Sequence, residues 1–149
     1  MAIQWIELTK LTIPAGEVLQ PWTLAIETIG DATHLKLESV GEWKVQSSVL
    51  PYGGPDGLAR PIMPDAELVL AKCPYCALIG KLGGSSAMHT PAADGAAGLV
   101  ADQPFAIGRL CVMAVPSGVL GPLFVGFNAV LRPINVKTPV VLTVSGAAP

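Results

Sequence analysis

Charged residues are scarce in this chain: they make up 13% of its 149 residues, and the formal net charge is -2. No stretch of Lys and Arg is dense enough to form a basic patch. Proteins that bind phosphate backbones carry such a patch, because much of their affinity comes from neutralising phosphate charge. The composition therefore argues against a nucleic-acid partner.

Long apolar runs are also missing, although 51% of the residues are hydrophobic. Polar residues, Gly or Pro interrupt every run before it reaches the roughly 18 residues that a membrane-spanning helix needs. The N-terminal stretch MAIQWIELTK carries Glu7 in its apolar part and lacks the basic region and the small-residue cleavage site of a secretory signal. We therefore predict no membrane partner and a cytoplasmic location, with export by a signal-independent route as the alternative.

Cysteine is rare too, with only Cys73, Cys76 and Cys111. An odd, small set in a chain of this length does not resemble a disulfide framework, so a reducing compartment is expected. The stretch Cys73-Pro74-Tyr75-Cys76 matches the glutaredoxin dithiol, which predicts a thiol-disulfide oxidoreductase as one alternative. That chemistry needs a helix after the second cysteine, whereas the following ALIGKLGGSS ends in glycines and small residues.

No metal site or catalytic constellation is evident. A structural zinc site needs four ligands, and the residues that could join the cysteine pair are scattered along the chain. We therefore predict that the protein is not an enzyme and has no resident metal.

Glycine and proline are abundant, at 16 and 14 residues, and leave little room for helices. We predict an all-β fold, a small β-sandwich, with residues 1–149 in one domain. The expected strands are Ile3–Leu11, Trp22–Thr28, His34–Ser39, Leu68–Ala71, Cys76–Lys81, Ala106–Ala114, Leu123–Phe127 and Val136–Val144.

The apolar pattern of three segments predicts how they are covered. His34–Ser39 alternates polar and apolar residues, as in a strand with one face in the core. Leu123–Phe127 and Pro139–Val144 are nearly continuous apolar runs, so we expect both of their faces to be covered, within the sandwich or by another subunit. This favours a homo-oligomer.

Two long irregular stretches, 49–67 and 83–103, separate the strands, and we assign function to the first.

Aromatic residues make up only 5% of the chain, which makes their placement informative. Sugars stack an apolar face on an aromatic ring while their hydroxyls bond to polar groups. Trp43 and Tyr52 border the start of the first long stretch and are candidates for such contacts, with burial in the core as the alternative. Asp56 is a further candidate in that stretch, with a solvating role as the alternative.

The chain contains, in this order, GEWKVQ, PYGGPDGLARPIMPD, ALIGKLGG and GPLFVGFNAVLRPINVKTPVVLTVSG. From about Trp22 onward it resembles the PA-IL (LecA) family of galactose-binding bacterial lectins. The resemblance implies a jelly-roll-type sandwich of the galactose-binding-domain-like class, and tetramers. In that family a Tyr carbonyl, an Asn-Asp pair and two later Asn residues hold calcium, and a loop His contacts the sugar.

Carried onto this chain, the family's pattern is altered. Its Trp matches Trp43, its Tyr falls near Gln46 unless Tyr52 takes that place, and its His falls near Arg60. Asn128 matches the first member of the Asn-Asp pair. The remaining ligand positions hold Ala129, Val136 and Lys137.

Calcium takes six to eight oxygen ligands and favours carboxylates, so we predict that it is lost. We expect a non-catalytic module that binds carbohydrate or another polar ligand without calcium. The candidate ligand-binding residues are Trp43, Tyr52, Asp56, Arg60, Asn128, Asn135 and Lys137. A structural self-assembly subunit without a sugar site is the alternative.

Overall fold

A computed structural model of the chain describes residues 4–19, 21–60, 62–83, 104–130 and 133–148. The strands are β1 (Ile6–Ile13), β2 (Gly16–Val18), β3 (Trp22–Ile26), β4 (His34–Val45), β5 (Leu78–Leu82), β6 (Pro104–Ala106), β7 (Leu110–Ala114), β8 (Leu123–Phe127) and β9 (Ile134–Ala147). One short 3-10 helix, η1 (Asp65–Glu67), lies between β4 and β5.

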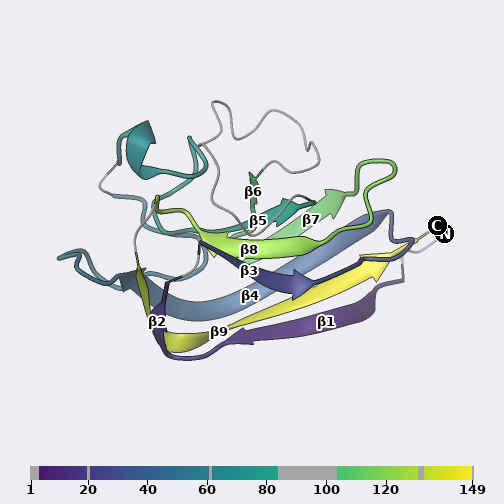
Figure 1. Cartoon of the computed structure of the whole chain (residues 1–149), viewed down its shortest axis with the longest axis horizontal. Helices are drawn as coiled ribbons and strands as arrows, with labels where there is room; N and C mark the ends of the chain where they lie inside the picture. Colours follow the sequence, from purple (N-terminus) through teal and green to yellow (C-terminus); the bar gives the residue numbers. More distant parts are fainter. Residues whose placement is uncertain (1–3, 20, 61, 84–103, 131–132, 149) are drawn as a thin grey trace.

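The strands form two antiparallel sheets that stack face to face (Figure 1). The first sheet has the order β1-β9-β4-β7, with β2 also pairing with the start of β9. The second sheet has the order β3-β8-β5-β6. The predicted all-β sandwich is confirmed.

The first sheet is buried on one face only. In β4, Leu35 and Leu37 enter the core, whereas the residues between and beside them face outward, which confirms the predicted alternation. In β9, Val140 and Leu142 are buried but Val141 is half-exposed. The prediction that both faces of Pro139–Val144 are covered is wrong within this chain. Along this stretch, one face of β9 packs against the second sheet, and the other face is exposed or half-exposed.

The second sheet is covered on both faces. Every residue of β5 and β8 is buried, which confirms the prediction for Leu123–Phe127. The inner face packs against the first sheet, and the outer face carries a separate apolar cluster of Trp22, Val69, Leu70, Ile79 and Phe124. Leu68–Ala71, predicted as a strand, is not one; this segment contributes Val69 and Leu70 to that outer cluster.

The predicted strand Ala106–Ala114 is also wrong, because the chain turns inside it. Gly108 has a φ of 62°, a left-handed conformation that glycine adopts without strain. The turn sends β6 to the second sheet and β7 to the edge of the first.

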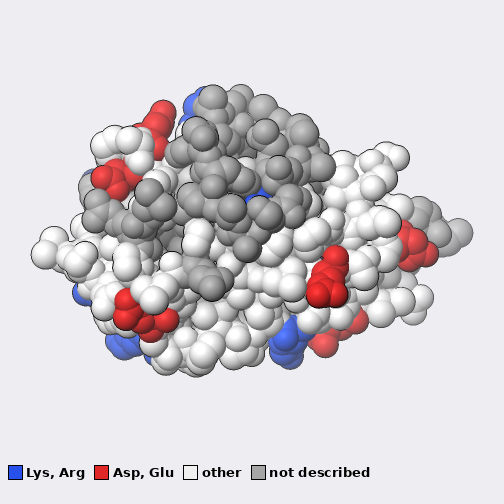
Figure 2. Space-filling model, in the orientation of Figure 1, with Lys and Arg blue, Asp and Glu red and all other residues white. Residues whose placement is uncertain are grey.

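Charged side chains on the face shown in Figure 2 are few, and both signs occur. In the described ranges, no helix is long and apolar enough to cross a membrane.

Candidate functional site

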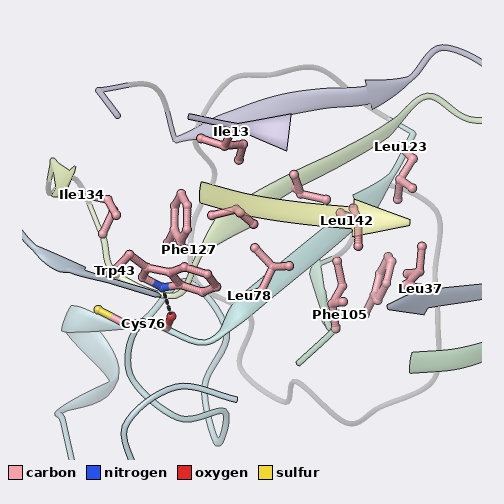
Figure 3. Close-up of a cluster of buried hydrophobic side chains, with 14 of the residues drawn as sticks. Ile13, Leu37, Trp43, Cys76, Leu78, Phe105, Leu123, Phe127, Ile134 and Leu142 are labelled. Carbon is pink, nitrogen blue, oxygen red and sulfur yellow. Dashed lines mark hydrogen bonds between the residues drawn. The ribbon is translucent and has the colours of Figure 1, made fainter. Parts of the chain in front are cut away.

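Trp43 lies in the core rather than at the surface. Its side chain is 0% exposed, and its indole Nε1 donates a hydrogen bond of 2.7 Å to the Cys76 carbonyl. The ring meets Phe127 edge-on, with centroids 5.0 Å apart (Figure 3). Of the two alternatives left open for Trp43, the structure supports the core, and no ring face is available to a sugar.

Asn128 is fully buried and bonded to backbone. Its Oδ1 accepts from the Leu70 N–H at 2.7 Å, and its Nδ2 donates to the carbonyls of Leu70 at 3.0 Å, Cys73 at 3.0 Å and Pro74 at 3.1 Å. We call this arrangement the Asn128 clamp. Since its polar atoms are all engaged inside the protein, Asn128 is not a ligand-binding residue in this structure. It holds the segment between η1 and β5 in place.

The cysteine pair lies in the turn that the Asn128 clamp holds. Burial raises the pKa of the Cys73 thiol to about 11 and that of Cys76 to about 12. A strand, β5, begins at Leu78, so no helix N-terminus faces the thiols. Both observations oppose the activated thiolate that dithiol exchange needs. All three cysteines of the chain are free thiols.

We therefore expect slow alkylation of both thiols near neutral pH. A pKa near 11 leaves about 100-fold less thiolate than an ordinary cysteine has, and the rate should rise about tenfold per pH unit as the pH approaches that pKa. Iodoacetamide labelling followed by mass spectrometry of the Cys73 and Cys76 peptides measures it. The unfolded chain in guanidinium is the control, where ordinary rates are expected. Fast labelling of either cysteine in the folded protein would favour the oxidoreductase alternative instead.

Three of the candidate residues, Tyr52, Asn135 and Lys137, lie together. Asn135 in β9 donates a hydrogen bond of 2.8 Å from Nδ2 to the Tyr52 hydroxyl, and the Nζ of Lys137 lies 5.2 Å from the ring centroid. The Nζ of Lys44 lies at the same distance, 5.2 Å. We call Lys44, Tyr52, Asn135 and Lys137 the Tyr52 cluster.

Strand pairing explains why these residues meet. Lys44 is opposite Asn135 in the β4–β9 ladder, and Glu17 of β2 is opposite Asn135 on the other side. Trp43 forms a β-bridge with Gly53, so the chain that follows β4 folds back along this end of the sheet. Tyr52, the residue before Gly53, is thereby placed over the end of the sheet. Neither Lys44 nor Lys137 is ion-paired with a carboxylate of the described chain. The sequence reading missed Lys44, because the predicted strand ended at Ser39 and the outward alternation continues to Val45.

A cleft of about 470 Å³ lies near the Tyr52 cluster, and none of the four cluster residues lines it. Lys44 connects the cluster to the cleft, because its Nζ donates a hydrogen bond of 3.2 Å to the carbonyl of Ser48, which lines the cleft. The cleft is lined by Val45, Ser47, Ser48, Val49, Leu50, Met63, Pro64, Glu67 and Tyr75. Most of these come from the first long irregular stretch, to which the sequence reading assigned function.

A second cleft, of about 320 Å³, lies on the other side of Met63 and Tyr75, which line both. Its walls are mainly apolar, with Asp65 and Lys72 as the charged lining residues. Lys72 has a φ of 64°, a conformation that costs energy for a residue with a side chain. The second cleft is shaped by the turn that the Asn128 clamp holds.

Asp56 and Arg60 do not join the Tyr52 cluster. Asp56 Oδ1 accepts a hydrogen bond of 2.9 Å from the Arg109 N–H, and Asp56 Oδ2 lies 3.9 Å from Arg109 Nε. These contacts stabilise the turn between β6 and β7. Arg60 is exposed and makes no hydrogen bond or ion pair with a described residue. The second long stretch, 83–103, lies outside the described residues except for Gly83.

The residues at the positions that the lectin resemblance assigns to calcium ligands do not fit that ion. Ala129 and Val136 are 5% and 2% exposed and pack in the core cluster, where they offer only hydrocarbon. Lys137 follows Val136 in β9, is exposed and carries a positive charge. Calcium needs several oxygen ligands, and within the described part of the chain no three His, Cys, Asp or Glu side chains gather.

No protein-family model matches this chain, and no curated protein matches it in sequence.

Proposed function

We propose that the protein is a non-catalytic module that binds a small carbohydrate or similar hydroxylated ligand, without calcium, at the Tyr52 cluster and the adjoining 470 Å³ cleft. One observation carries this proposal: Tyr52 meets Asn135, which is 83 residues away in the chain, and its β9 neighbour Lys137, at one spot near an open cleft. The finer assignment, a jelly-roll related to galactose-binding lectins, rests on the sequence resemblance.

The chemistry of the site suits hydroxyl groups. Lysine ammonium and asparagine amide groups donate hydrogen bonds, and Glu17 beside Asn135 offers an acceptor. Ser47 and Ser48 line the cleft, and a serine hydroxyl can both donate and accept a hydrogen bond. The Ser48 hydroxyl already accepts one from the Leu50 N–H at 3.0 Å. Clefts of 300–1,000 Å³ with a few polar groups are typical of small-molecule sites. The ammonium groups replace the positive charge that a metal ion would otherwise supply.

A glycan array with and without a chelator tests the proposal. We expect binding that the chelator leaves unchanged. Replacing Lys137 with alanine should weaken it at least about tenfold, because a hydrogen bond to a charged group contributes about 1.5–3 kcal/mol. Tyr52→Phe should also weaken it, since it removes the hydroxyl that Asn135 holds.

Lys10→Ala is the matched control, because Lys10 is an exposed lysine of the same sheet, in β1, outside the cluster. It should leave affinity unchanged. Equal binding by the Lys137→Ala variant would contradict the assigned site, and binding that the chelator abolishes would contradict the calcium-free mechanism. An array with no binding under either condition would exclude carbohydrate as the ligand and favour the assembly alternative.

A cytoplasmic, reducing location is part of this proposal, supported by the three free thiols. The assembly alternative is favoured by a separate feature, the open edge of the first sheet.

A further inference from the structure

Strand β7 forms one edge of the first sheet and pairs only with β4 among the described strands. At the ends of this ladder, the Ser39 N–H bonds to the Arg109 carbonyl at 3.0 Å, and the Val115 N–H bonds to the Thr33 carbonyl at 2.8 Å. Odd-numbered residues of β7 therefore direct their backbone groups toward β4. Because an antiparallel ladder alternates, Leu110, Val112 and Ala114 direct theirs away from it.

These outward backbone groups have no partner in the described part of the chain. Natural proteins usually protect such an edge with a charge, a proline or a bulge. The stretch LCVMA has no charge and no proline, and its ladder with β4 is regular. Leu110 and Val112 are also 61% and 58% exposed. With respect to the described residues, the edge is thus both open and apolar.

The edge is complementary to itself. An antiparallel copy centred on Val112 places Val112 opposite its own equivalent, Leu110 opposite Ala114, and Cys111 opposite Met113. Arg109 then faces Val115 of the other strand, so no like charges meet. Each of the three outward residues has one donor and one acceptor, which gives about six new backbone hydrogen bonds. The apolar side chains of the exposed face become cross-strand neighbours.

We propose that two copies of this chain pair through β7, antiparallel, about a two-fold axis at Val112, so that their first sheets become one continuous sheet. Such a contact is isologous and closes on itself, because each copy uses the same strand. The pairing does not involve the Tyr52 cluster and does not depend on the proposed ligand.

Analytical ultracentrifugation of the full chain tests this pairing. We expect a dimer at about 10–100 μM, and a shift toward monomer of at least about tenfold in Kd for Val112→Lys, which sets two ammonium groups against each other. The variant should still fold, because the Val112 side chain is exposed and its backbone groups make no bond to β4. Strand-type circular dichroism and a cooperative thermal transition establish that; a small fall in the midpoint is expected, because the new ammonium group lies opposite Lys36.

Two further samples make the result decisive. Val40→Lys is the matched control: Val40 is 62% exposed on the same sheet but lies in the interior strand β4, so it should leave the dimer intact. Mixing Val112→Lys with Val112→Glu should restore a dimer through opposite charges. A monomeric wild type at about 100 μM would overturn the proposal. So would an oligomer that Val112→Lys leaves unchanged, one that Val40→Lys breaks equally, or a mixture that stays monomeric.

Discussion

Replacing Asn128 with alanine is expected to lower the free energy of unfolding by about 3–4 kcal/mol. The substitution leaves the N–H and the carbonyl of Leu70 without their partners, and Leu70 is only 1% exposed. A buried backbone group without a partner costs about 1–3 kcal/mol. Urea denaturation followed by circular dichroism measures the change.

Asn135→Ala is the control for this prediction, since it removes the same side chain from a half-exposed site with a single bond to Tyr52. We expect a loss of less than about 1 kcal/mol, because water can replace that bond. If the Asn128 variant lost no more stability than the Asn135 variant, the Asn128 clamp would not hold the turn as described.

Trp43→Ala is expected to destabilise the protein by about 3–5 kcal/mol, the usual cost of removing a buried tryptophan side chain. The change opens a cavity beside Phe127 and also removes the donor to the Cys76 carbonyl. Trp43→Phe should recover part of the loss, since a ring then fills some of the cavity while the hydrogen bond stays absent. The same urea experiment compares the three proteins.

Trp5 supplies the matched tryptophan. It precedes β1, is half-buried and lies against Lys36, with its ring centroid 5.2 Å from the ammonium. Trp5→Ala should cost about 1 kcal/mol, in line with a partly exposed cation–π contact. A cost for Trp43→Ala as small as that would contradict its place at the centre of the core.

These two residues hold the same piece of chain. Trp43 bonds to Cys76, and Asn128 bonds to Cys73 and Pro74, so the turn with the cysteine pair is fixed from two elements. Both residues were selected from the sequence as ligand contacts. Their polar atoms instead stabilise the turn, and residues of this turn line both clefts.

Part of the fold was predictable because it depends on local patterns. The alternation in His34–Ser39 and the apolar run Leu123–Phe127 each indicate how many faces of a strand meet the core. Predictions failed where the same residue types serve another purpose. Leu68–Ala71 is apolar because it covers the second sheet, and Ala106–Ala114 contains the Gly108 turn between sheets.

The candidate site was predictable only in part, for a similar reason. Tyr52 is an aromatic residue at the border of the first long stretch, Lys137 stands at a position that the lectin resemblance assigns to a calcium ligand, and Asn135 is a nearby amide. The structure does bring the three together. Lys44 went unnoticed because one more outward lysine in a strand carries no local signal. Asp56 and Arg60 had the same appearance in the sequence and lie away from the cluster.

By itself, the sequence determined that this chain forms antiparallel strands with few helices, because the spacing of glycine, proline and apolar residues acts over a few neighbours. Only the tertiary structure decided which polar residues face a ligand and which hold the core. Asn128 and Leu70 are 58 residues apart in the chain, and Asn135 and Tyr52 are 83 apart. Hydrogen bonds between such distant residues depend on strand pairing and on how the connecting segments fold back over each sheet, and no local pattern contains that information.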